Sequence, residues 1–251
     1  MPLLMDTTME ELQTSSNYQF SAVRVDELGA TDYTLVSLVQ DVSGSVSGFE
    51  LDMESCLKTI LESCQRSPRS DNLLLRLLKF NNSLEEVHGF KMLDTVTPAD
   101  YDNCLSPSGG TALFDATQAA VEATRDYATI LNDQDFLVNA VVFVITDGGD
   151  NGSSATATTV KAAIDDTMKA ECLESLTVVL IGVDDQDVMI RNALQQFQTD
   201  ADITQFVGLG DATAKRLAKL AQFVSRSISS TSQALGSGAP STLLNSDSLT
   251  I

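Results

Sequence analysis

Basic residues are scarce in this chain. Its 251 residues hold 15 Lys and Arg against 35 Asp and Glu, which gives a formal net charge of −20 at pH 7. A negative field of this size repels nucleic-acid phosphates and anionic lipids, so it argues against binding to nucleic acid or to an anionic membrane surface. It favours a soluble protein that attracts cations or basic partner surfaces. The simpler explanation for most of the charge is a solvated acidic surface.

Cysteine and histidine are also scarce, which removes several kinds of site. The 4 cysteines include no Cys-x-x-Cys pair, so no zinc site is predicted. Cys56 and Cys64 would lie about 12 Å apart on one helix, too far for a disulfide. Reduced thiols in the cytoplasm are the simplest interpretation. The single histidine, His88, has no Ser or Cys nucleophile motif beside it, which favours a structural role over a catalytic one.

Long apolar runs are missing as well. No stretch approaches the roughly 20 apolar residues of a membrane-spanning helix, so no membrane span is predicted. The N-terminus has no basic region followed by an apolar run, and we therefore expect no signal peptide and a cytoplasmic location. The hydrophobic fraction of 43% is ordinary for a globular protein, and the length suits one large domain with appendages.

Apolar and amphipathic segments alternate along most of the chain. Continuous apolar runs predict buried strands, and apolar residues at helical spacing predict helices between them. The strands are expected at 33–39, 72–80, 136–146, 176–181 and 203–207, with a hairpin partner at 86–92. The helices are expected at 48–65, 113–127, 158–172, 184–197 and 212–229. This alternation predicts an α/β fold with a doubly wound, mostly parallel sheet, one antiparallel edge strand and helices on both faces.

The two ends of the chain differ from this alternating part. Residues 1–17 are polar and predict a mobile segment, while 18–25 alternate enough to form an edge strand, so 1–31 are expected to be an N-terminal extension. Residues 32–229 are expected to form the domain. Residues 230–251 are rich in Ser, Thr, Gly and Ala and are expected to be a flexible tail, dispensable for folding, because they bury too little apolar surface to offset ordering entropy.

Oxygen-bearing side chains gather where the first buried strand ends. The run 35–39 predicts a strand buried on both faces, and Asp41, Ser43 and Ser45 follow it at spacing two. Alternate side chains of an extended backbone point the same way, so these oxygens would converge at the strand's carboxyl end, where open α/β sheets bind ligands. Such donors suit Mg²⁺, Mn²⁺ or Ca²⁺. The alternative is a Ser- and Gly-rich turn that only caps the next helix.

Two later segments carry the same kind of side chain. Gly109 and Gly110 lead into Thr111 before a predicted helix, and the glycines let the backbone pass close to a bound ion. Asp147 ends the most apolar strand of the chain, and an acidic, Gly-rich loop that contains Asp150 follows it. Thr111 taken alone is explained equally well as a helix cap.

In this order the three segments resemble the metal-ion-dependent adhesion site, or MIDAS, of von Willebrand factor type A (vWA) domains. The family pattern is Asp-x-Ser-x-Ser, then a Thr after a Gly-rich loop, then an Asp that ends a buried strand. The resemblance covers residues 32 to 229 and implies a prokaryotic, stand-alone vWA protein with a Rossmann-like fold. Carried over residue by residue, it implies that the metal ligands are Asp41, Ser43, Ser45, Thr111 and Asp147.

The same resemblance implies which residues support these ligands. Gly110, Asp115 and Asp150 would support the ligands without binding the metal themselves. The negative charge of Asp115 would also interact favourably with the positive N-terminal end of its helix. Two aspartates would neutralise one Mg²⁺, and the hydroxyls would add neutral oxygens. In the family an open coordination position is filled by a carboxylate of another protein. The resemblance therefore implies a metal-dependent module that binds an Asp or Glu side chain of a protein partner and is not an enzyme.

Two other functions stay open at this point. A Mg²⁺-dependent phosphatase or phosphotransferase of the haloacid dehalogenase type also places aspartates at strand ends. It needs an acid two residues after the nucleophilic Asp and a Lys downstream, whereas here position 43 is Ser and no Lys lies near Asp147. The other alternative is a structural or assembly subunit, because stand-alone vWA proteins of prokaryotes often work with AAA+ ATPases or in multiprotein assemblies.

Overall fold

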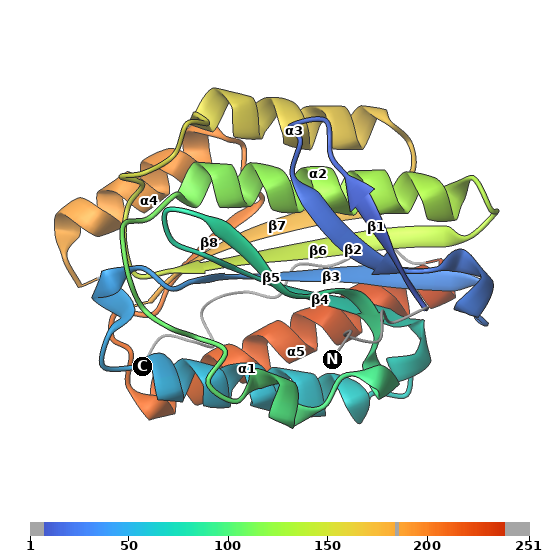
Figure 1. The fold of residues 1–251 in the computed structure, drawn as a ribbon, viewed down its shortest axis with the longest axis horizontal. Coiled ribbons are helices and arrows are strands. Elements are labelled where there is room, and N and C mark those ends of the chain that lie inside the picture. Colours follow the sequence, from blue (N-terminus) through green and yellow to red (C-terminus); the bar gives the residue numbers. More distant parts are fainter. Residues whose placement is uncertain (1–7, 184–185, 239–251) are drawn as a thin grey trace, which may run out of the picture.

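The computed structural model describes residues 8–183 and 186–238. These residues form an eight-stranded sheet in the order β1-β2-β5-β4-β3-β6-β7-β8, with helices on both faces (Figure 1). The strands are β1 Met9–Gln13, β2 Gln19–Val23, β3 Asp32–Asp41, β4 Leu73–Phe80, β5 Leu84–Met92, β6 Leu137–Thr146, β7 Ser175–Gly182 and β8 Gln205–Gly208. The helices are α1 Glu50–Gln65, α2 Leu113–Asn132, α3 Ala157–Lys169, α4 Val188–Asp200 and α5 Ala214–Ser237. None of the helices described here is both long and apolar enough to cross a lipid bilayer.

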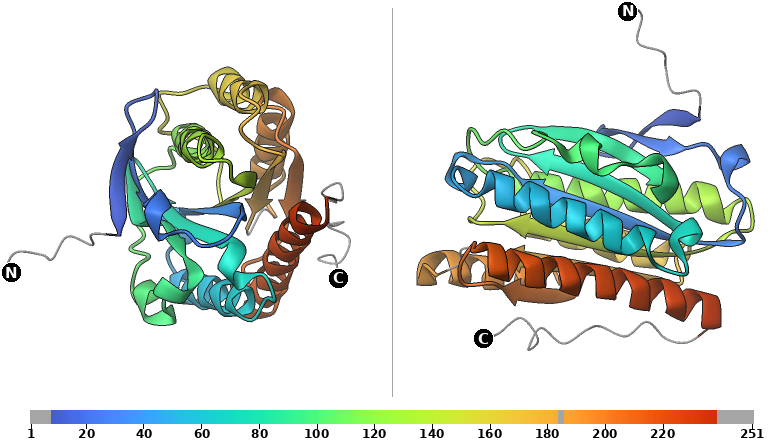
Figure 2. Two further views of the ribbon diagram at one scale, coloured as in Figure 1. Left: turned by 90° about the vertical axis from the view of Figure 1, so that its right-hand side faces the viewer. Right: turned by 90° about the horizontal axis from the view of Figure 1, so that it is seen from below.

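The sheet lies between two helical layers, which the end-on view shows clearly (Figure 2). Helices α1 and α5 cover one face, and α2, α3 and α4 cover the other. Strand β3 is central and is buried on both faces. Val36 and Leu38 pack with residues of α1 and α5, whereas Leu35 and Val39 pack with residues of α2. The continuous apolar run of β3 therefore has the cause expected for a parallel sheet, in which neither face meets water.

The predicted fold class is confirmed. Strands β4, β3, β6, β7 and β8 pair in parallel, and β5 runs antiparallel to β4 in the predicted hairpin. In the β3–β6 pair Gln40 stands opposite Ile145. The next residues along, Asp41 and Thr146, therefore end their strands side by side, and Asp147 follows immediately at the same edge of the sheet.

The N-terminal extension contains more structure than its composition predicts. Residues 9–13, expected to be mobile, form β1 and pair antiparallel with β2. In β1 two acidic residues, Glu10 and Glu11, stand between Met9 and Leu12, which pack against the core cluster that contains Phe20 and Phe90. A short, half-polar strand of this kind is stabilised by its hairpin partner, so its own composition says little about it. Residues 1–7 lie outside the described residues.

The β1–β2 hairpin docks on β5 beside a buried ion pair between Arg76 on β4 and Glu86 on β5. Arg76 on β4 is wholly buried, and its Nε donates to Glu86 at 2.7 Å, while another of its nitrogens donates to the Tyr18 hydroxyl at 2.9 Å. The second carboxylate oxygen of Glu86 accepts the Ser21 amide at 2.9 Å. Gly89 permits this approach, because a Cβ there would stand 1.9 Å from the Ser21 carbonyl oxygen. Strand β2 therefore joins β5 only because β5 has no side chain at that point.

The last helix continues past residue 229, where the domain was expected to end and the flexible tail to begin. Helix α5 continues to Ser237, and Thr231 and Ser232 are buried in it. Arg69 Nε donates to Ser232 Oγ at 2.9 Å, and Asn139 Nδ2 donates to the Thr231 carbonyl oxygen at 2.8 Å. Small Ser, Thr and Ala side chains let a helix lie close to a sheet, and the same side chains gave the segment the composition of a tail. The part of the expected tail at 239–251 lies outside the described residues.

A truncation would measure how much 230–238 contributes. We compare the chain ending at Gly238 with the chain ending at Ser229 by urea denaturation. The shorter chain loses the two hydrogen bonds at Ser232 and Thr231, each worth about 1 kcal/mol, together with buried surface, so it should be less stable by about 2 kcal/mol or more. Equal stability of the two chains would show that residues 230–238 are dispensable for folding, as the composition predicts.

The cysteines are free thiols, in agreement with the spacing argument. Cys56 and Cys64 are buried on α1, and burial raises the pKa of each thiol to about 12. Thiols with such pKa values are protonated at neutral pH and are therefore inert packing groups.

His88 is a packed core residue. Its ring lies against the Tyr101 ring in a stacked arrangement, Nε2 lies 3.0 Å from the Tyr101 hydroxyl, and Nδ1 lies 2.9 Å from the Gly89 carbonyl oxygen. Burial lowers the pKa of His88 below its usual 6.5, since it penalises the charged imidazolium. The single histidine therefore stays neutral in the fold at neutral pH, which supports the structural role expected for it.

This depressed pKa predicts a pH dependence of stability. The unfolded chain takes up the His88 proton more readily than the folded one, so stability is lost as the pH falls from the unfolded pKa toward the lower folded value. Between pH about 7.5 and about 5.5 the free energy of unfolding should fall more in the wild type than in His88→Gln, which does not titrate. As a direct check, NMR titration of the one imidazole should give a pKa below 6.5. A measured value above that would contradict the assignment.

Candidate metal centre

The carboxyl ends of β3 and β6 bring the predicted ligands together. Asp41 is fully buried, and its Oδ1 accepts the Ser43 amide at 2.7 Å. Ser43 Oγ lies 3.0 Å from Ser45 Oγ, and Ser45 Oγ donates to Asp147 Oδ1 at 2.9 Å. The 3-10 turn Gly44–Val46 sets this curve of the chain. Four of the five predicted side chains thus form one connected cluster of oxygens.

Thr111 reaches the cluster from the Gly-rich loop. It is buried, its amide donates to Asn151 Oδ1 at 2.7 Å, and its hydroxyl oxygen lies 4.0 Å from the point where a Cβ on Gly148 would stand. The hydroxyl therefore faces the end of β6, next to Asp147. Two backbone bonds hold the loop against the end of β3: the Gly44 amide donates to Gly109 O at 3.0 Å, and the Ser108 amide donates to Val42 O at 2.9 Å.

Gly110 supports the loop by having no side chain. Its amide donates to Asn82 Oδ1 at 2.6 Å, and a Cβ on it would stand 2.6 Å from Asn151 Oδ1. Any larger residue would collide with the amide that holds Thr111. Gly110 therefore lies in close contact with the Asn82 and Asn151 side chains, and its supporting role at a metal stays a prediction.

The predicted supporting aspartates brace the loop that follows β6. Asp150 Oδ1 accepts the Phe114 amide near the start of α2 at 3.3 Å and also the Ser153 hydroxyl. Asp115 accepts the amides of Ser154 and Ala155 at 3.1 and 2.7 Å. These bonds join the first turn of α2 to loop 150–155. Both aspartates therefore position backbone around the ligand cluster.

Sequence reasoning missed three residues that hold the cluster in place. Thr146 Oγ1 donates to Asp41 Oδ2 at 2.6 Å, and the side-chain oxygens of Asn82 and Asn151 accept the amides of Gly110 and Thr111. Thr146 was hidden as the last residue of an apolar strand. Asn82 and Asn151 were assigned to a turn and a loop, and only their position in space gives them this role.

Electrostatics at the cluster favours a bound cation. Burial raises the pKa of Asp41 to about 6, the nearby Asp147 carboxylate adds to this rise, and the hydrogen bonds from Thr146 and Ser43 oppose it. Two carboxylates so close and so poorly hydrated repel each other when both are ionised. A divalent cation between them would remove this cost. The described residues contain no group of three or more His, Cys, Asp or Glu side chains suited to a metal, so a cation at this cluster would need hydroxyl oxygens as further ligands.

The oxygens of the cluster lie within hydrogen-bonding distance of one another, and the cluster has one open side. The Ser43–Ser45 and Ser45–Asp147 oxygen separations are 3.0 and 2.9 Å. Ser45 is exposed, while Asp41, Ser43, Thr111 and Asp147 are buried, so the cluster opens to solvent on the Ser45 side. The donor set therefore fits a divalent ion that is accessible from outside. The assignment of the five ligands stays a prediction.

Comparison with solved structures gives the fold a context. No family model and no curated protein sequence matches the chain. Among solved structures, the PilB minor pilin from Streptococcus sanguinis is 15% identical with a TM-score of 0.59, over 88% of this chain and 66% of the pilin. Proximal thread matrix protein 1 from the mussel byssus is 17% identical with a TM-score of 0.54, over 79% of this chain and 47% of that one. The pilus adhesin SpaC from Lactobacillus rhamnosus GG is 12% identical with a TM-score of 0.56, over 89% and 33%.

These likenesses concern the fold. The chain matches about half of the mussel protein, 66% of the pilin and 33% of the adhesin, at identities where only architecture is comparable. The mussel protein has also been solved with zinc in a MIDAS motif. The architecture of this chain is a vWA-like, Rossmann-like α/β fold.

A substitution at Asp41 would test the metal centre. In Asp41→Asn the new amide oxygen still accepts the Ser43 amide, and the new NH₂ group can donate to Thr146 Oγ1, which can turn its own proton to the Gly148 carbonyl oxygen 3.0 Å away. The fold should persist while one anionic ligand is lost. At a Mg²⁺ concentration about 100 times its dissociation constant the wild type should gain about 2.7 kcal/mol, and the variant should gain almost nothing.

Thermal unfolding with MgCl₂ and with EDTA measures this difference. The matched control is Asp165→Asn, which removes the same charge from the surface of α3. It should keep the full response to Mg²⁺. A full response in both Asp41→Asn and Asp147→Asn would show that the ion, if bound, is bound elsewhere.

Proposed function

We propose that this chain is a protein-binding module whose bound divalent metal coordinates an Asp or Glu side chain of a partner protein. The observation that carries the proposal is the connected cluster of Asp41, Ser43, Ser45 and Asp147, with Thr111 facing it and with its open side at Ser45. The vWA-like fold of pilus and byssus proteins supports an interaction role, since those solved structures include an adhesin and a MIDAS motif.

The chain's own residues would position the ion. Asp41 and Asp147 offset its charge, and the hydroxyls of Ser43, Ser45 and Thr111 add neutral donors. Thr146 and the Ser43 amide fix the Asp41 carboxylate through hydrogen bonds of 2.6 and 2.7 Å. When bound, the metal supplies a positive centre with a position open to an external carboxylate. The aspartates can act directly or through water, because Mg²⁺ gives up its hydration reluctantly.

We propose Mg²⁺ as the ion, with Mn²⁺ or Ca²⁺ as alternatives. Mg²⁺ and Mn²⁺ take carboxylate and hydroxyl oxygens together with water, which suits a cluster with two carboxylates and an open side, and Ca²⁺ takes oxygens of the same kind. All five predicted ligands are oxygen donors, which magnesium and manganese accept and zinc ligand sets of Cys and His do not resemble.

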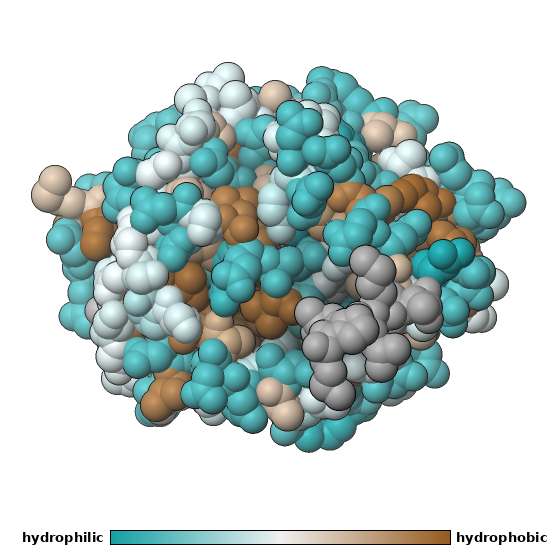
Figure 3. Space-filling model, viewed as in Figure 1, coloured by the Kyte–Doolittle hydropathy of each residue, from teal (hydrophilic) through white to brown (hydrophobic). Residues whose placement is uncertain are grey.

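An apolar rim beside the cluster supports a protein as the partner. Helix α4 lies against the loop after β6, since a Cβ on Gly149 would meet the Ala193 side chain at 3.6 Å. The helix begins with Val188 and Met189, which are 68% and 81% exposed. The face shown in Figure 3 is mostly hydrophilic, with apolar side chains at its left edge and also in its centre and at its upper right. A macromolecule covers such side chains, whereas a small anion on the metal would leave them in water.

The further details of this function are also proposals. We propose that the chain has no catalytic activity, because carboxylates, hydroxyls and amides make up the cluster and a positioned base or nucleophile is not among them. We propose a cytoplasmic location, which the free thiols support. A stand-alone prokaryotic protein of this kind would suit work with an AAA+ ATPase or inside a multiprotein assembly.

Peptide selection would test the acidic partner without knowing its name. A random peptide library displayed on phage is bound to the immobilised protein in MgCl₂ and eluted with EDTA. Selected peptides should contain an Asp or Glu, and changing that residue to Asn or Gln should weaken binding at least tenfold, about 1.4 kcal/mol, because the amide gives the metal no charge.

The Thr111 hydroxyl provides a matched pair of variants. Thr111→Ala removes one predicted ligand and should bind the selected peptides weakly, while Thr111→Ser keeps the hydroxyl and should bind them well. Peptides that stay bound in EDTA, or that bind equally to Thr111→Ala, would show that the interface lies away from the metal.

A further inference from the structure

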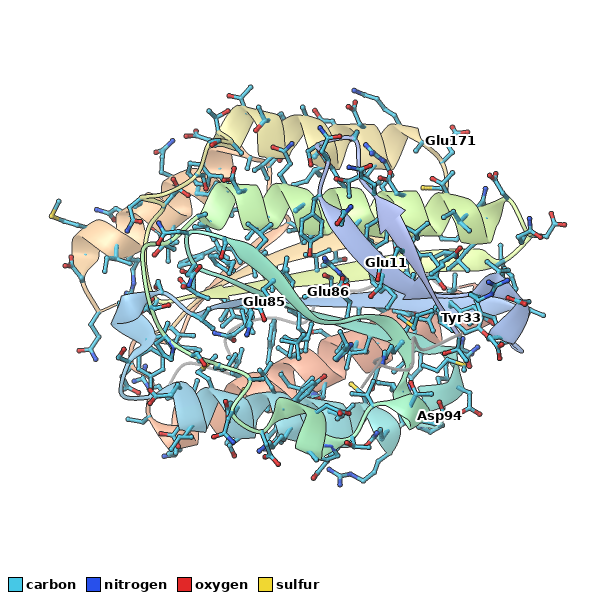
Figure 4. All side chains as sticks on the ribbon, viewed as in Figure 1. Glu11, Tyr33, Glu85, Glu86, Asp94 and Glu171 are labelled. Carbon is cyan, nitrogen blue, oxygen red and sulfur yellow. The ribbon has the colours of Figure 1, made fainter. Side chains whose placement is uncertain are left out.

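A cavity lies at the opposite end of the sheet from the metal centre. It has a volume of about 650 Å³ and is formed by the start of β3, the end of α1 and two 3-10 turns, Ser70–Asn72 and Leu93–Thr95. Tyr33 and Asp94, which both line it, are seen at the right of Figure 4, whereas the carboxyl ends of the parallel strands lie at the left. Its size is that of a small-molecule site, typically about 300–1,000 Å³.

The amide side chains of this cavity have already used their donors. Gln65 Nε2 donates to the Leu93 and Val96 carbonyl oxygens at 2.9 and 2.8 Å. Asn72 Nδ2 donates to the Asp32 carbonyl oxygen at 2.9 Å and to Asp32 Oδ1 at 3.3 Å. The side-chain oxygens of both amides accept no hydrogen bond from the residues that the structure describes. Each amide therefore offers the cavity an acceptor.

The hydroxyls of the cavity differ in what they leave open. The Ser70 hydroxyl donates to Asp71 Oδ1 at 3.3 Å, whereas the Tyr33 hydroxyl accepts the Ala30 amide at 2.8 Å and keeps its own proton as a donor. Asp71 and Asp94 are exposed and add two carboxylates at the mouth. Among the described residues that line the cavity there is no Lys, Arg or His. The side chains of the lining thus present two carboxylates and two amide oxygens as acceptors, against the Tyr33 O–H as a donor.

The acceptors are held in place before any ligand arrives. The two bonds from Gln65 fix the turn that carries Asp94, and the bonds from Asn72 fix the turn that carries Asp71. Arg69, the basic residue that directly precedes the turn Ser70–Asn72, is engaged with Asp32 and Ser232. Its guanidinium therefore does not supply the missing charge. A fixed set of unmatched acceptors favours a ligand that brings donors and positive charge.

We propose that this cavity binds a small organic cation whose ammonium or guanidinium group donates to Asp71, Asp94 and the oxygens of Gln65 and Asn72. The net charge of −20 raises the local concentration of such cations. A metal ion fits less well, because the cavity is far larger than an ion and also presents the apolar side chains of Met92 and Leu93. A guanidinium or polyamine stem suits both parts of the lining, since its carbon chain packs on apolar surface while its nitrogens donate.

Calorimetric titration with arginine amide tests the proposal directly. The protein is kept in EDTA and at about 0.15 M salt, which screens long-range attraction and keeps the metal centre out of the measurement. Both probes are used with the α-amino group acetylated, so that arginine amide carries only its guanidinium charge and citrulline amide, of nearly the same shape, is the matched neutral probe. Arginine amide should bind saturably at one site and at least tenfold more tightly than citrulline amide. Spermidine, in a separate titration, shows whether a free polyamine is preferred to an arginine-like group.

Paired variants separate the cavity from the overall charge. The double variant Asp71→Asn/Asp94→Asn should weaken arginine amide binding at least tenfold, while Asp165→Asn/Glu171→Gln, which removes the same charge at α3 and just after it, should not. In NMR spectra the side-chain amide signals of Gln65 and Asn72 should shift on binding. Equal binding of citrulline amide, equal losses in the two double variants, or the lack of saturation would overturn the proposal.

Discussion

The parallel pairing of β3 with β6, with Gln40 opposite Ile145, places two carboxylates at one edge of the sheet. Asp41 is the last residue of β3, and Asp147 follows the residue that ends β6 beside it. A shift of one residue would turn Asp41 and its serines to the other face of the sheet. The site therefore depends on a register that is fixed elsewhere, by the apolar side chains of the two strands packed between α1, α5 and α2. The core supplies the rigidity, and the segments that follow the strands supply Asp147 and the hydroxyls.

Much of this arrangement follows from the sequence because two signals act together. Buried parallel strands leave continuous apolar runs, and the chain then places Asp41 and Asp147 directly after two of them. Spacing alone brought Ser43 and Ser45 toward the same point, and the structure links them at 3.0 Å. Thr111 could be predicted as a metal ligand only from the order of all three motifs, since a Thr before a helix has a simpler explanation as a cap.

The remainder could not be predicted because it depends on contacts between distant segments. The polar composition of 230–238 concealed the close packing of α5, in which Arg69 meets Ser232 across 163 positions of the chain. The half-polar β1 is a strand because β2 pairs with it. Thr146, Asn82 and Asn151 act on neighbours that only the fold provides. The amides of Gln65 and Asn72 likewise use their donors on backbone carbonyls that only the fold brings to them.

Docking of the β1–β2 hairpin on the sheet depends on Gly89 of β5. The hairpin meets the rest of the sheet where a Cβ would lie 1.9 Å from the Ser21 carbonyl oxygen, and where Arg76 and Glu86 receive Tyr18 and Ser21. A protein engineer who wished to graft this hairpin onto another vWA-like scaffold would have to install a glycine and a buried Arg–Glu pair in the acceptor strands. Without them β5 would remain the edge strand of that sheet, and the grafted hairpin would not dock on it.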